Sequence, residues 1–153
     1  MQKEFPIIWL TGNTGAGKTT VAFGAQRSLR AADDSLGWHL VILDGDEMRE
    51  SISLGATLSA QDRHEHNLRV ARLAQVLQKQ GLLVVVAVIA PFATTRQEVT
   101  NLCQPRWVYI QRSGLGASDK PYEIPENPDL VLDHNTLSIE ASREAFITFL
   151  RSQ

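Results

Sequence analysis

A glycine-rich segment near the start of the chain has residue types and a spacing that could bind phosphate. It contains Gly12-Asn13-Thr14-Gly15-Ala16-Gly17-Lys18-Thr19 and matches the pattern G-x-x-x-x-G-K-S/T. Glycine lets a backbone wrap closely around an anion, so that successive N–H groups point at it. In such a loop Lys18 reaches the β- and γ-phosphates of a nucleoside triphosphate, and the Thr19 hydroxyl binds Mg²⁺. The alternative is a glycine turn that fits the pattern by chance.

The segments on either side of this loop favour phosphate binding over a chance turn. An apolar run at residues 7–10 precedes the loop, and a helical pattern at residues 21–30 follows it. Strand, glycine-rich turn and helix in this order form the P-loop context, and a helix N-terminus favours negative charge. We therefore expect ATP and Mg²⁺ as cofactors. The predicted ATP-binding residues are Gly12, Asn13, Thr14, Gly15, Ala16, Gly17, Lys18, Thr19 and Thr20.

A pair of carboxylates follows the second predicted strand, at residues 39–43. Asp44 and Asp46 stand at the carboxyl end of that strand, and Arg49 follows one turn into a short predicted helix. Parallel α/β sheets build their sites at this end of their strands, whereas a helix cap is the structural alternative for either carboxylate. We predict a catalytic role for Asp44 and Asp46 together with Lys18, and expect Asp44 to share Mg²⁺ with Thr19.

A long helix is predicted to begin after Ser59, which has an N-cap position with Asp62 three residues later. The helix runs to residue 80. Arg63, His66 and Asn67 lie near its N-terminal end, on the side where a substrate could meet them. His64 and His66 are two residues apart, which places them on different faces of the helix, so we expect no zinc site.

The rest of the chain alternates apolar runs with helical patterns, which is typical of a parallel sheet covered by helices. We predict an α/β, P-loop NTPase-type three-layer fold, with a five-stranded parallel sheet and helices on both faces. One kinase-type domain is expected to span residues 1–153. The predicted strands are residues 7–11, 39–43, 82–89, 107–111 and 130–133, with 82–89 at the centre of the sheet. Residues 33–35 should form a turn, Thr94 or Thr95 should cap a helix that runs to residue 102, and the last helix should span residues 138–151.

Composition limits the partners that this chain can have. Of its 153 residues 43% are hydrophobic and 21% are charged, as in a soluble globular protein. A net charge of −2 gives no support for binding nucleic acid or an anionic membrane, and the longest apolar run, residues 82–91, is too short to span a bilayer. The single cysteine, Cys103, is expected to be a buried structural thiol and fits a reducing compartment. With no visible signal peptide, we expect a cytoplasmic protein.

Several blocks beyond the P-loop are specific enough to compare with known families. They are Leu43-Asp44-Gly45-Asp46-Glu47-Met48-Arg49, Asp62-Arg63-His64-Glu65, Gly81-Leu82-Leu83-Val84, Ile89-Ala90-Pro91-Phe92 with Arg96, and Pro121-Tyr122-Glu123-Ile124-Pro125-Glu126-Asn127-Pro128-Asp129-Leu130. Together they cover most of the chain and resemble adenylylsulfate kinases. That family passes the γ-phosphate of ATP to the ribose 3′-hydroxyl of adenylyl sulfate. The resemblance implies a phosphotransferase with an alcohol acceptor and a small-molecule nucleotide substrate, and we include a homodimer among the expectations.

The resemblance also implies roles for particular residues. Asp46 resembles the carboxylate that orients or deprotonates the acceptor hydroxyl, and Arg49 and Arg63 resemble the arginines that hold the phosphosulfate. Phe92 resembles an aromatic residue that packs against the acceptor adenine. These roles suit phosphoryl transfer, which needs positioning and charge neutralisation more than covalent chemistry. The implied substrate-binding residues are Asp46, Arg49, Arg63, His66, Ile89, Phe92 and Lys120.

The chain departs from the family pattern in three respects. An asparagine and an arginine of the family are replaced by His66 and Leu68. A serine that is sometimes assigned as a phosphorylated intermediate corresponds to Ala90, so direct transfer is the expected route. The long segment that carries a basic lid in the family is reduced here to residues 113–120, with Arg112 and Lys120 as candidate lid cations.

These departures leave two further hypotheses open. The chain could phosphorylate another nucleotide conjugate, such as a cytidine diphosphate derivative. It could also be a nucleotide-binding regulatory module that has lost turnover together with its lid.

Overall fold

Five parallel strands form a single sheet at the centre of the molecule. The structure is a computed structural model that describes residues 4–114 and 121–153. The strand order is β2-β3-β1-β4-β5, and every neighbouring pair is parallel. The strands are β1 (Ile8–Thr11), β2 (Leu40–Asp44), β3 (Leu83–Ala87), β4 (Arg106–Gln111) and β5 (Leu130–Asp133). The predicted five-stranded parallel sheet is thus confirmed, but β1 is the central strand and β3 lies between β1 and β2.

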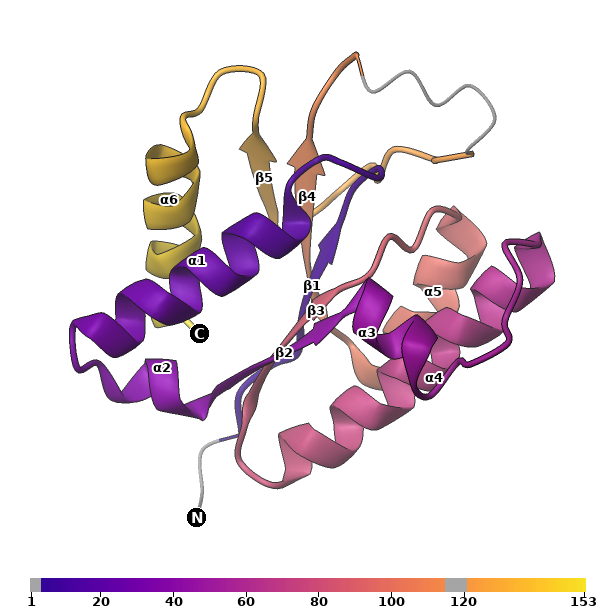
Figure 1. Cartoon of the computed structure of the whole chain (residues 1–153), viewed down its shortest axis with the longest axis horizontal. Coiled ribbons are helices and arrows are strands. Elements are labelled where there is room, and N and C mark those ends of the chain that lie inside the picture. The colour runs from indigo at the N-terminus through magenta and orange to yellow at the C-terminus, as the bar shows by residue number, and fades with distance from the viewer. Residues whose placement is uncertain (1–3, 115–120) are drawn as a thin grey trace.

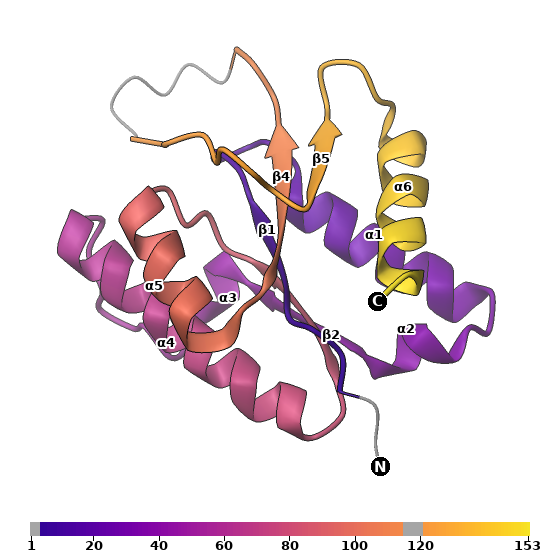
Figure 2. The same ribbon diagram turned by 180° about the vertical axis from the view of Figure 1, so that it is seen from behind.

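Helices cover both faces of this sheet and complete the three predicted layers (Figure 1). They are α1 (Lys18–Ala31), α2 (Ser35–His39), α3 (Gly45–Glu50), α4 (Ala60–Lys79), α5 (Ala93–Cys103) and α6 (Ile139–Arg151). Helices α1, α2 and α6 lie on one face, and α3, α4 and α5 lie on the other. Figure 2 shows the same division from behind. No helix among the described residues is long and apolar enough to cross a membrane.

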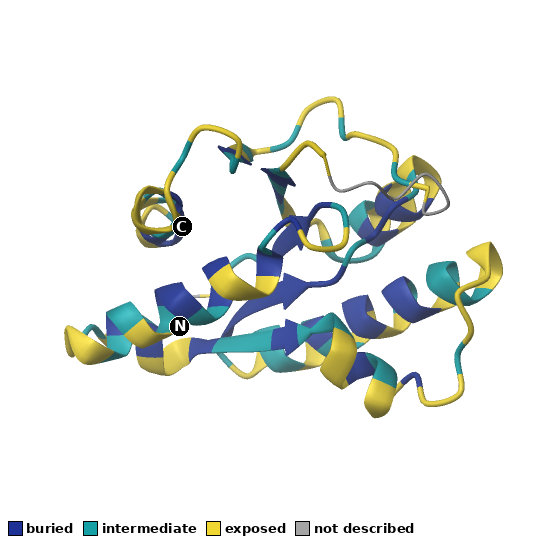
Figure 3. Cartoon of the chain, turned by 45° about the horizontal axis from the view of Figure 1, so that its top comes forward, coloured by how far each residue is buried: buried dark blue, intermediate teal, exposed yellow. Residues whose placement is uncertain are grey.

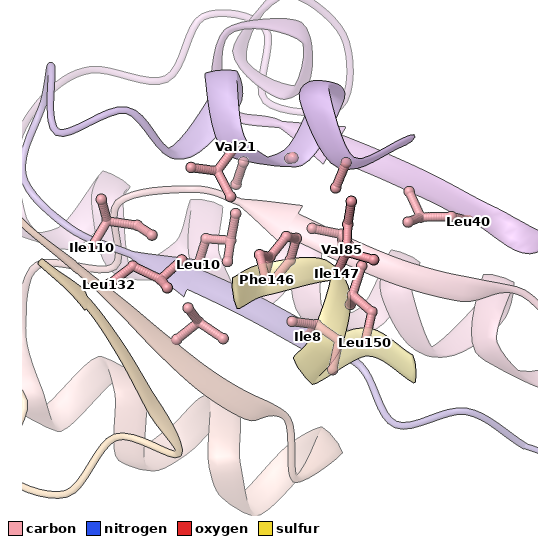
Figure 4. Packing of buried hydrophobic residues seen from close by; sticks show 14 of the residues in the cluster. Ile8, Leu10, Val21, Leu40, Val85, Ile110, Leu132, Phe146, Ile147 and Leu150 are labelled. Carbon is pink, nitrogen blue, oxygen red and sulfur yellow. The ribbon is translucent and has the colours of Figure 1, made fainter. Parts of the chain in front are cut away.

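Alternation along the strands sends side chains into two separate cores. In β1, Ile8 and Leu10 pack toward α1 and α6, whereas Trp9 packs toward α4 together with the preceding Ile7. This is the two-residue period that a strand imposes. Figure 4 shows the first core, in which Phe146 and Leu150 of α6 lie over β1. Strands β1 and β3 are fully buried, whereas β2, β4 and β5 are only partly buried and the outer sides of the helices are exposed (Figure 3). Covered on both faces, the sheet is a rigid base for the loops at its ends.

Two local predictions differ from the structure. Residues 33–35 are predicted as a turn and residues 39–43 as a strand, but the short helix α2 occupies residues 35–39. The Asp34 carboxylate caps it by accepting a hydrogen bond from the Leu36 N–H at 3.0 Å. Neither Thr94 nor Thr95 caps α5. Its N-cap residue is Phe92, and the N–H of Ala93 donates to Glu123 Oε1 at 3.2 Å. The donor and acceptor are thirty residues apart, so local sequence gives no signal of this contact.

Candidate active site

The P-loop connects β1 to α1 at the carboxyl end of the central strand. Its tight path needs glycine at two positions. A Cβ atom at Gly12 would lie 2.7 Å from the carbonyl oxygen of Ile110, and Gly17 has a φ of 106°, in the left-handed region. The loop is closed by a hydrogen bond from the Ala16 N–H to the Asn13 carbonyl at 3.0 Å. The geometry is that of a phosphate cradle on a helix N-terminus.

Lys18 is more buried than the sequence indicates. Lysine is almost never fully buried in proteins, yet this residue is only 8% exposed. The Nζ atom donates to the carbonyl oxygens of Gly12 and Asn13 at 2.7 and 3.0 Å. Burial lowers the pKa of Lys18 to about 8, against a smaller opposing effect of the Asp44 carboxylate. Burial therefore disfavours the charged form of Lys18 at the loop, and a bound phosphate would stabilise that charge.

Asp44 faces the P-loop from the end of β2. Its Oδ1 accepts a hydrogen bond from the Thr19 hydroxyl at 2.8 Å. Its Oδ2 lies 3.4 Å from the N–H of Glu47, so that the same carboxylate is the N-cap of α3. The catalytic and the capping interpretations are thus compatible. A hydroxyl and a carboxylate oxygen side by side are hard ligands that suit Mg²⁺, which takes most of its remaining ligands from water and nucleotide phosphates.

One pocket of about 340 Å³ joins the P-loop to the ends of β2 and β3 and the start of α4. It is lined by most of the predicted site residues. They are Asn13, Thr14, Gly15, Lys18, Thr19, Asp44, Asp46, Arg49, Arg63, His66 and Ile89.

Several other predicted residues do not line the pocket. Gly12, Ala16, Gly17 and Thr20 belong to the loop or to the first turn of α1 without facing it. Phe92 is half-buried at the N-cap of α5, and the structure does not bring it into the pocket. Lys120 lies outside the described residues.

Two arginines converge opposite the P-loop. Arg49 comes from α3 and Arg63 from the first turn of α4, and both are half-buried. Burial and the neighbouring Arg63 charge lower the pKa of Arg49, while Asp46 acts in the opposite direction. The Arg63 Nε also donates to the carbonyl of Leu58 at 2.8 Å, which anchors its side chain. Two like charges brought together in a pocket favour binding of an anion between them.

His66 and Asn67 form the wall next to these arginines. His66 is 1% exposed, and its Nδ1 lies 2.6 Å from Ser53 Oγ. Arg69 donates to the same hydroxyl at 2.7 Å. Asn67, expected from the sequence near a substrate, also lines the pocket. Ser53 and Arg69 are not among the residues that the sequence singles out, and no local pattern identifies them. The neighbouring His64 contacts Thr95 on α5 instead, at 2.8 Å, in agreement with the different faces expected from the spacing.

A buried arginine supports the pocket wall that follows β3. The sequence allows Arg96 to face either the site or solvent, but its Nη1 donates to the Ala90 carbonyl at 2.7 Å and its Nη2 to the Glu123 carbonyl at 2.6 Å. Its guanidinium lies over the ring of Tyr122. Ala90 itself has a φ of 48° and lines the pocket. Arg96 therefore joins two distant segments that border the site.

Two further residues brace the P-loop from distant strands. His134, just after β5, has Nδ1 at 2.7 Å from the Ala16 carbonyl and Nε2 at 2.7 Å from Ser142 Oγ. Arg112, just after β4, donates to the Gly15 carbonyl at 3.1 Å. Arg112 is a candidate lid cation by sequence, and in this structure it contacts the P-loop. His134 has no signal in the sequence, because its partner lies 118 residues earlier.

Comparisons with known proteins identify relatives of this chain. Residues 5–113 match the family described as adenylylsulphate kinase. The probable adenylyl-sulfate kinase of Bacillus subtilis is 33% identical over 172 aligned positions, which cover 96% of this chain and 85% of the relative.

Two solved structures are similar to this chain over nearly its whole length. The Mycobacterium tuberculosis APS kinase CysC in complex with AMPPNP and APS is 27% identical, with a TM-score of 0.76 over 98% of this chain and 99% of that one. The crystal structure of APE1195 is also 27% identical and has a TM-score of 0.87, covering 99% of this chain and 98% of that one.

Proposed function

Because this chain belongs to the adenylylsulphate kinase family, we propose that it transfers the γ-phosphate of ATP to the ribose 3′-hydroxyl of adenylyl sulfate. The observation that carries the proposal is the convergence of two anion-binding regions in one pocket. The P-loop with Lys18 forms one region, and Arg49 and Arg63 form the other. A kinase needs both, because a triphosphate and a second anionic substrate must meet in line. Asp46 lines the same pocket and would stand at the acceptor hydroxyl.

The chemistry is a direct displacement at phosphorus. The 3′-oxygen of the acceptor forms a bond to the γ-phosphorus, and the bond from that phosphorus to the bridging β–γ oxygen breaks. ADP leaves with the electron pair, and the hydroxyl proton passes to the Asp46 carboxylate. Lys18 and the P-loop N–H groups neutralise charge on the phosphates. A phosphorylated intermediate cannot form at position 90, because the side chain of Ala90 has no nucleophilic atom.

Mg²⁺ belongs to the proposal as the ion that Thr19 and Asp44 would hold. Bound there, it would neutralise phosphate charge. Its binding has a readout that is independent of turnover. We expect ATP with Mg²⁺ to raise the melting temperature, with a stabilisation of about 2.7 kcal/mol at a ligand concentration one hundred times Kd. Most of this shift should disappear with EDTA or in Thr19→Ala. An equal shift with and without the metal would contradict the assignment.

A panel of phosphoryl acceptors tests the function itself. Purified protein is incubated with ATP and Mg²⁺, and ADP release is measured with adenylyl sulfate, with cytidine diphosphate conjugates and without any acceptor. Release that depends on adenylyl sulfate supports the proposal. Release that depends on a cytidine conjugate would replace the substrate, and the departure at His66 is the feature that keeps this candidate open. Binding of ATP without any acceptor-dependent release would instead indicate a regulatory module.

Three further expectations, on domain extent, compartment and oligomeric state, accompany the proposal. We take residues 1–153 as one P-loop kinase domain acting on a small nucleotide. We also propose a cytoplasmic enzyme, supported by the single cysteine. Cys103 is half-buried and not fully buried as expected, but burial still raises the pKa of its thiol to about 11, which suits an unreactive structural thiol. A homodimer is the third expectation, and the molar mass from light scattering tests it.

A further inference from the structure

His134 bonds a single peptide group of the P-loop. It follows β5 directly, and its Nδ1 lies 2.7 Å from the carbonyl oxygen of Ala16. A carbonyl oxygen can only accept a hydrogen bond, so Nδ1 carries a proton and donates it. Nδ1 is a donor in the charged ring as well, and the assignment therefore holds whether the imidazole is neutral or protonated. His134 is thus a fixed donor to the loop.

The same hydrogen bond sets the direction of a loop N–H. The Ala16 carbonyl and the Gly17 N–H belong to one peptide group, which is planar and trans, so they point in opposite directions. Gly15 and Lys18, on either side of this peptide group in the chain, both line the pocket. Main-chain N–H groups of such a loop are the donors that cradle phosphates. By holding the carbonyl, His134 fixes where the Gly17 N–H points.

Gly17 allows the imidazole to approach this closely. Its φ of 106° lies in the left-handed region, and a Cβ atom there would lie 3.0 Å from both Cε1 and Nδ1 of His134. Helix α1 begins at the next residue, Lys18. The ring therefore packs against the point where the loop becomes the helix. Rotation of the peptide group before Gly17 would break the bond to Nδ1 directly ahead of the phosphate-binding lysine.

Two further contacts hold His134 in place. Its main-chain N–H donates to the Gln111 carbonyl at 2.8 Å, which continues the pairing of β5 with β4. Its Nε2 lies 2.7 Å from Oγ of Ser142, a residue of α6 that is 0% exposed. A hydroxyl can donate to a neutral ring or accept from a charged one, so this contact also exists in both forms. The imidazole is therefore anchored to the sheet and to α6.

We propose that His134 is a positioning residue for phosphate binding, which orients the Ala16–Gly17 peptide group before ATP arrives, with Ser142 holding its ring. The inference rests on the part of the proposed function that places the ATP phosphates at the P-loop, and it is independent of the acceptor. An amide that is already oriented binds an anion more tightly, because less conformational freedom is lost on binding. Removing the donor should therefore weaken the binding of phosphates specifically.

The first experiment measures binding and needs no acceptor. Calorimetry gives Kd for ATP with Mg²⁺, and displacement of ATP gives Kd for tripolyphosphate, which has no base or ribose. His134→Ala should weaken the binding of both about tenfold, as expected for the loss of one positioning hydrogen bond. His64→Ala is the matched control, because His64 contacts α5 and does not line the pocket. It should bind both ligands like the wild type.

The two ligands also identify the part of ATP that His134 affects. A loss for ATP alone, with unchanged binding of tripolyphosphate, would assign the residue to the base or the ribose and overturn the inference. Equal affinities in His134→Ala and the wild type would overturn it as well. If neither ligand bound the wild-type protein, phosphate binding at the P-loop would be wrong, and the proposed function with it. An acceptor other than adenylyl sulfate would change none of these binding results.

Two replacements separate the donor from the volume of the ring. His134→Asn places an amide N–H close to the position of Nδ1 and should keep most of the ATP affinity. His134→Leu fills similar space without a donor and should lose it, and melting temperatures show that both variants fold. If His134→Leu bound ATP as tightly as His134→Asn, the ring would only fill space and the positioning role would be wrong. This comparison decides the question even if His134→Ala fails to fold.

Ser142→Ala keeps the donor but releases the other side of the ring. It should weaken ATP binding less than His134→Ala does, by about threefold, because the bond to Ala16 remains. In turnover assays KM for ATP should rise in both variants, while the acceptor KM stays unchanged. A lower melting temperature with full ATP affinity in Ser142→Ala would show that Ser142 only supports the fold. A rise of both KM values in His134→Ala would indicate a general disturbance of the site and overturn the specific role of His134.

Discussion

Lys18 shows how a single residue couples the charge of the P-loop to stability. Its pKa is about 8 in the folded protein, against 10.5 for a solvated lysine side chain, so the unfolded state binds more protons between these values. Stability from this group therefore rises with pH across that window and is lost as pH falls through 8. Lys18→Met removes the titration altogether. The difference between the two proteins isolates it from all other groups.

We expect the wild type to gain stability relative to Lys18→Met between pH 8 and 10.5, by at most about 3 kcal/mol at 1.36 kcal/mol per pH unit. Urea unfolding of both proteins at about pH 7.5 and about pH 10 measures this. Kinase turnover should be abolished in Lys18→Met at every pH, because no neighbour duplicates its charge at the phosphates. A pH-independent stability difference, or near-normal turnover, would contradict this account of Lys18.

Arg49 and Arg63 should act on the acceptor and not on ATP. Arg49→Ala and Arg63→Ala should each weaken acceptor binding by about 2 kcal/mol or more, because a charged hydrogen bond is lost in a partly closed site. Acceptor and ATP KM values, with ADP release as the signal, distinguish the two substrates. Should either variant lose ATP affinity with an unaltered acceptor KM, the arginine has been assigned to the wrong substrate. Arg27→Ala, on an α1 residue that does not line the pocket, is a charge-matched control.

At the scale of elements, Arg96 of α5 holds together the segment after β3, at Ala90, and the distant segment at Glu123. Arg96→Met keeps the length of the side chain but removes both donors, which leaves the Ala90 and Glu123 carbonyls without those bonds. We expect about 2 kcal/mol or more of lost stability, measured by denaturant unfolding. The acceptor KM should also rise, because Ile89, Ala90 and Pro91 line the pocket. A loss of stability with an unchanged acceptor KM would show that Arg96 does not position the pocket wall.

At the scale of the whole molecule, this chain is shorter than its relatives. The alignment with the Bacillus subtilis protein spans 172 positions, more than the 153 residues present here, so the relative carries residues that this chain lacks. By resemblance the missing stretch is the basic lid near residues 113–120. A lid excludes water and completes the charge around the transferred group.

A shortened lid should let water reach the γ-phosphate. We expect acceptor-free ATP hydrolysis to form a larger share of turnover here than in a long-lidded adenylyl-sulfate kinase measured under the same conditions. The acceptor KM should also depend more strongly on Arg49 and Arg63, since fewer contacts remain. If acceptor-free hydrolysis were the same share of turnover in both enzymes, another structure would have to cover the site. A neighbouring subunit would be examined first.

The sequence by itself determined the features that local spacing encodes. The P-loop, the Ser59 cap of α4 and the strands all follow from patterns a few residues long. The Ser59 hydroxyl does accept from the Asp62 N–H, at 3.1 Å. Parallel strands end at one edge of the sheet, and this rule predicts that Asp46, Arg49 and Arg63 lie close together there. Family resemblance supplied their proposed chemistry.

Only the tertiary structure decided contacts between segments that are far apart in the chain. The central place of β1, the burial of Lys18 and the Ser53–His66 contact depend on how separate elements pack. So do the links from Arg96 to Glu123 and from His134 to the P-loop. Such contacts are selected by shape and by the need to pair buried polar groups, and neither leaves a periodic signal. This is why the sequence placed His66 near a substrate, while its contact with Ser53 became visible only from the packing of the two segments.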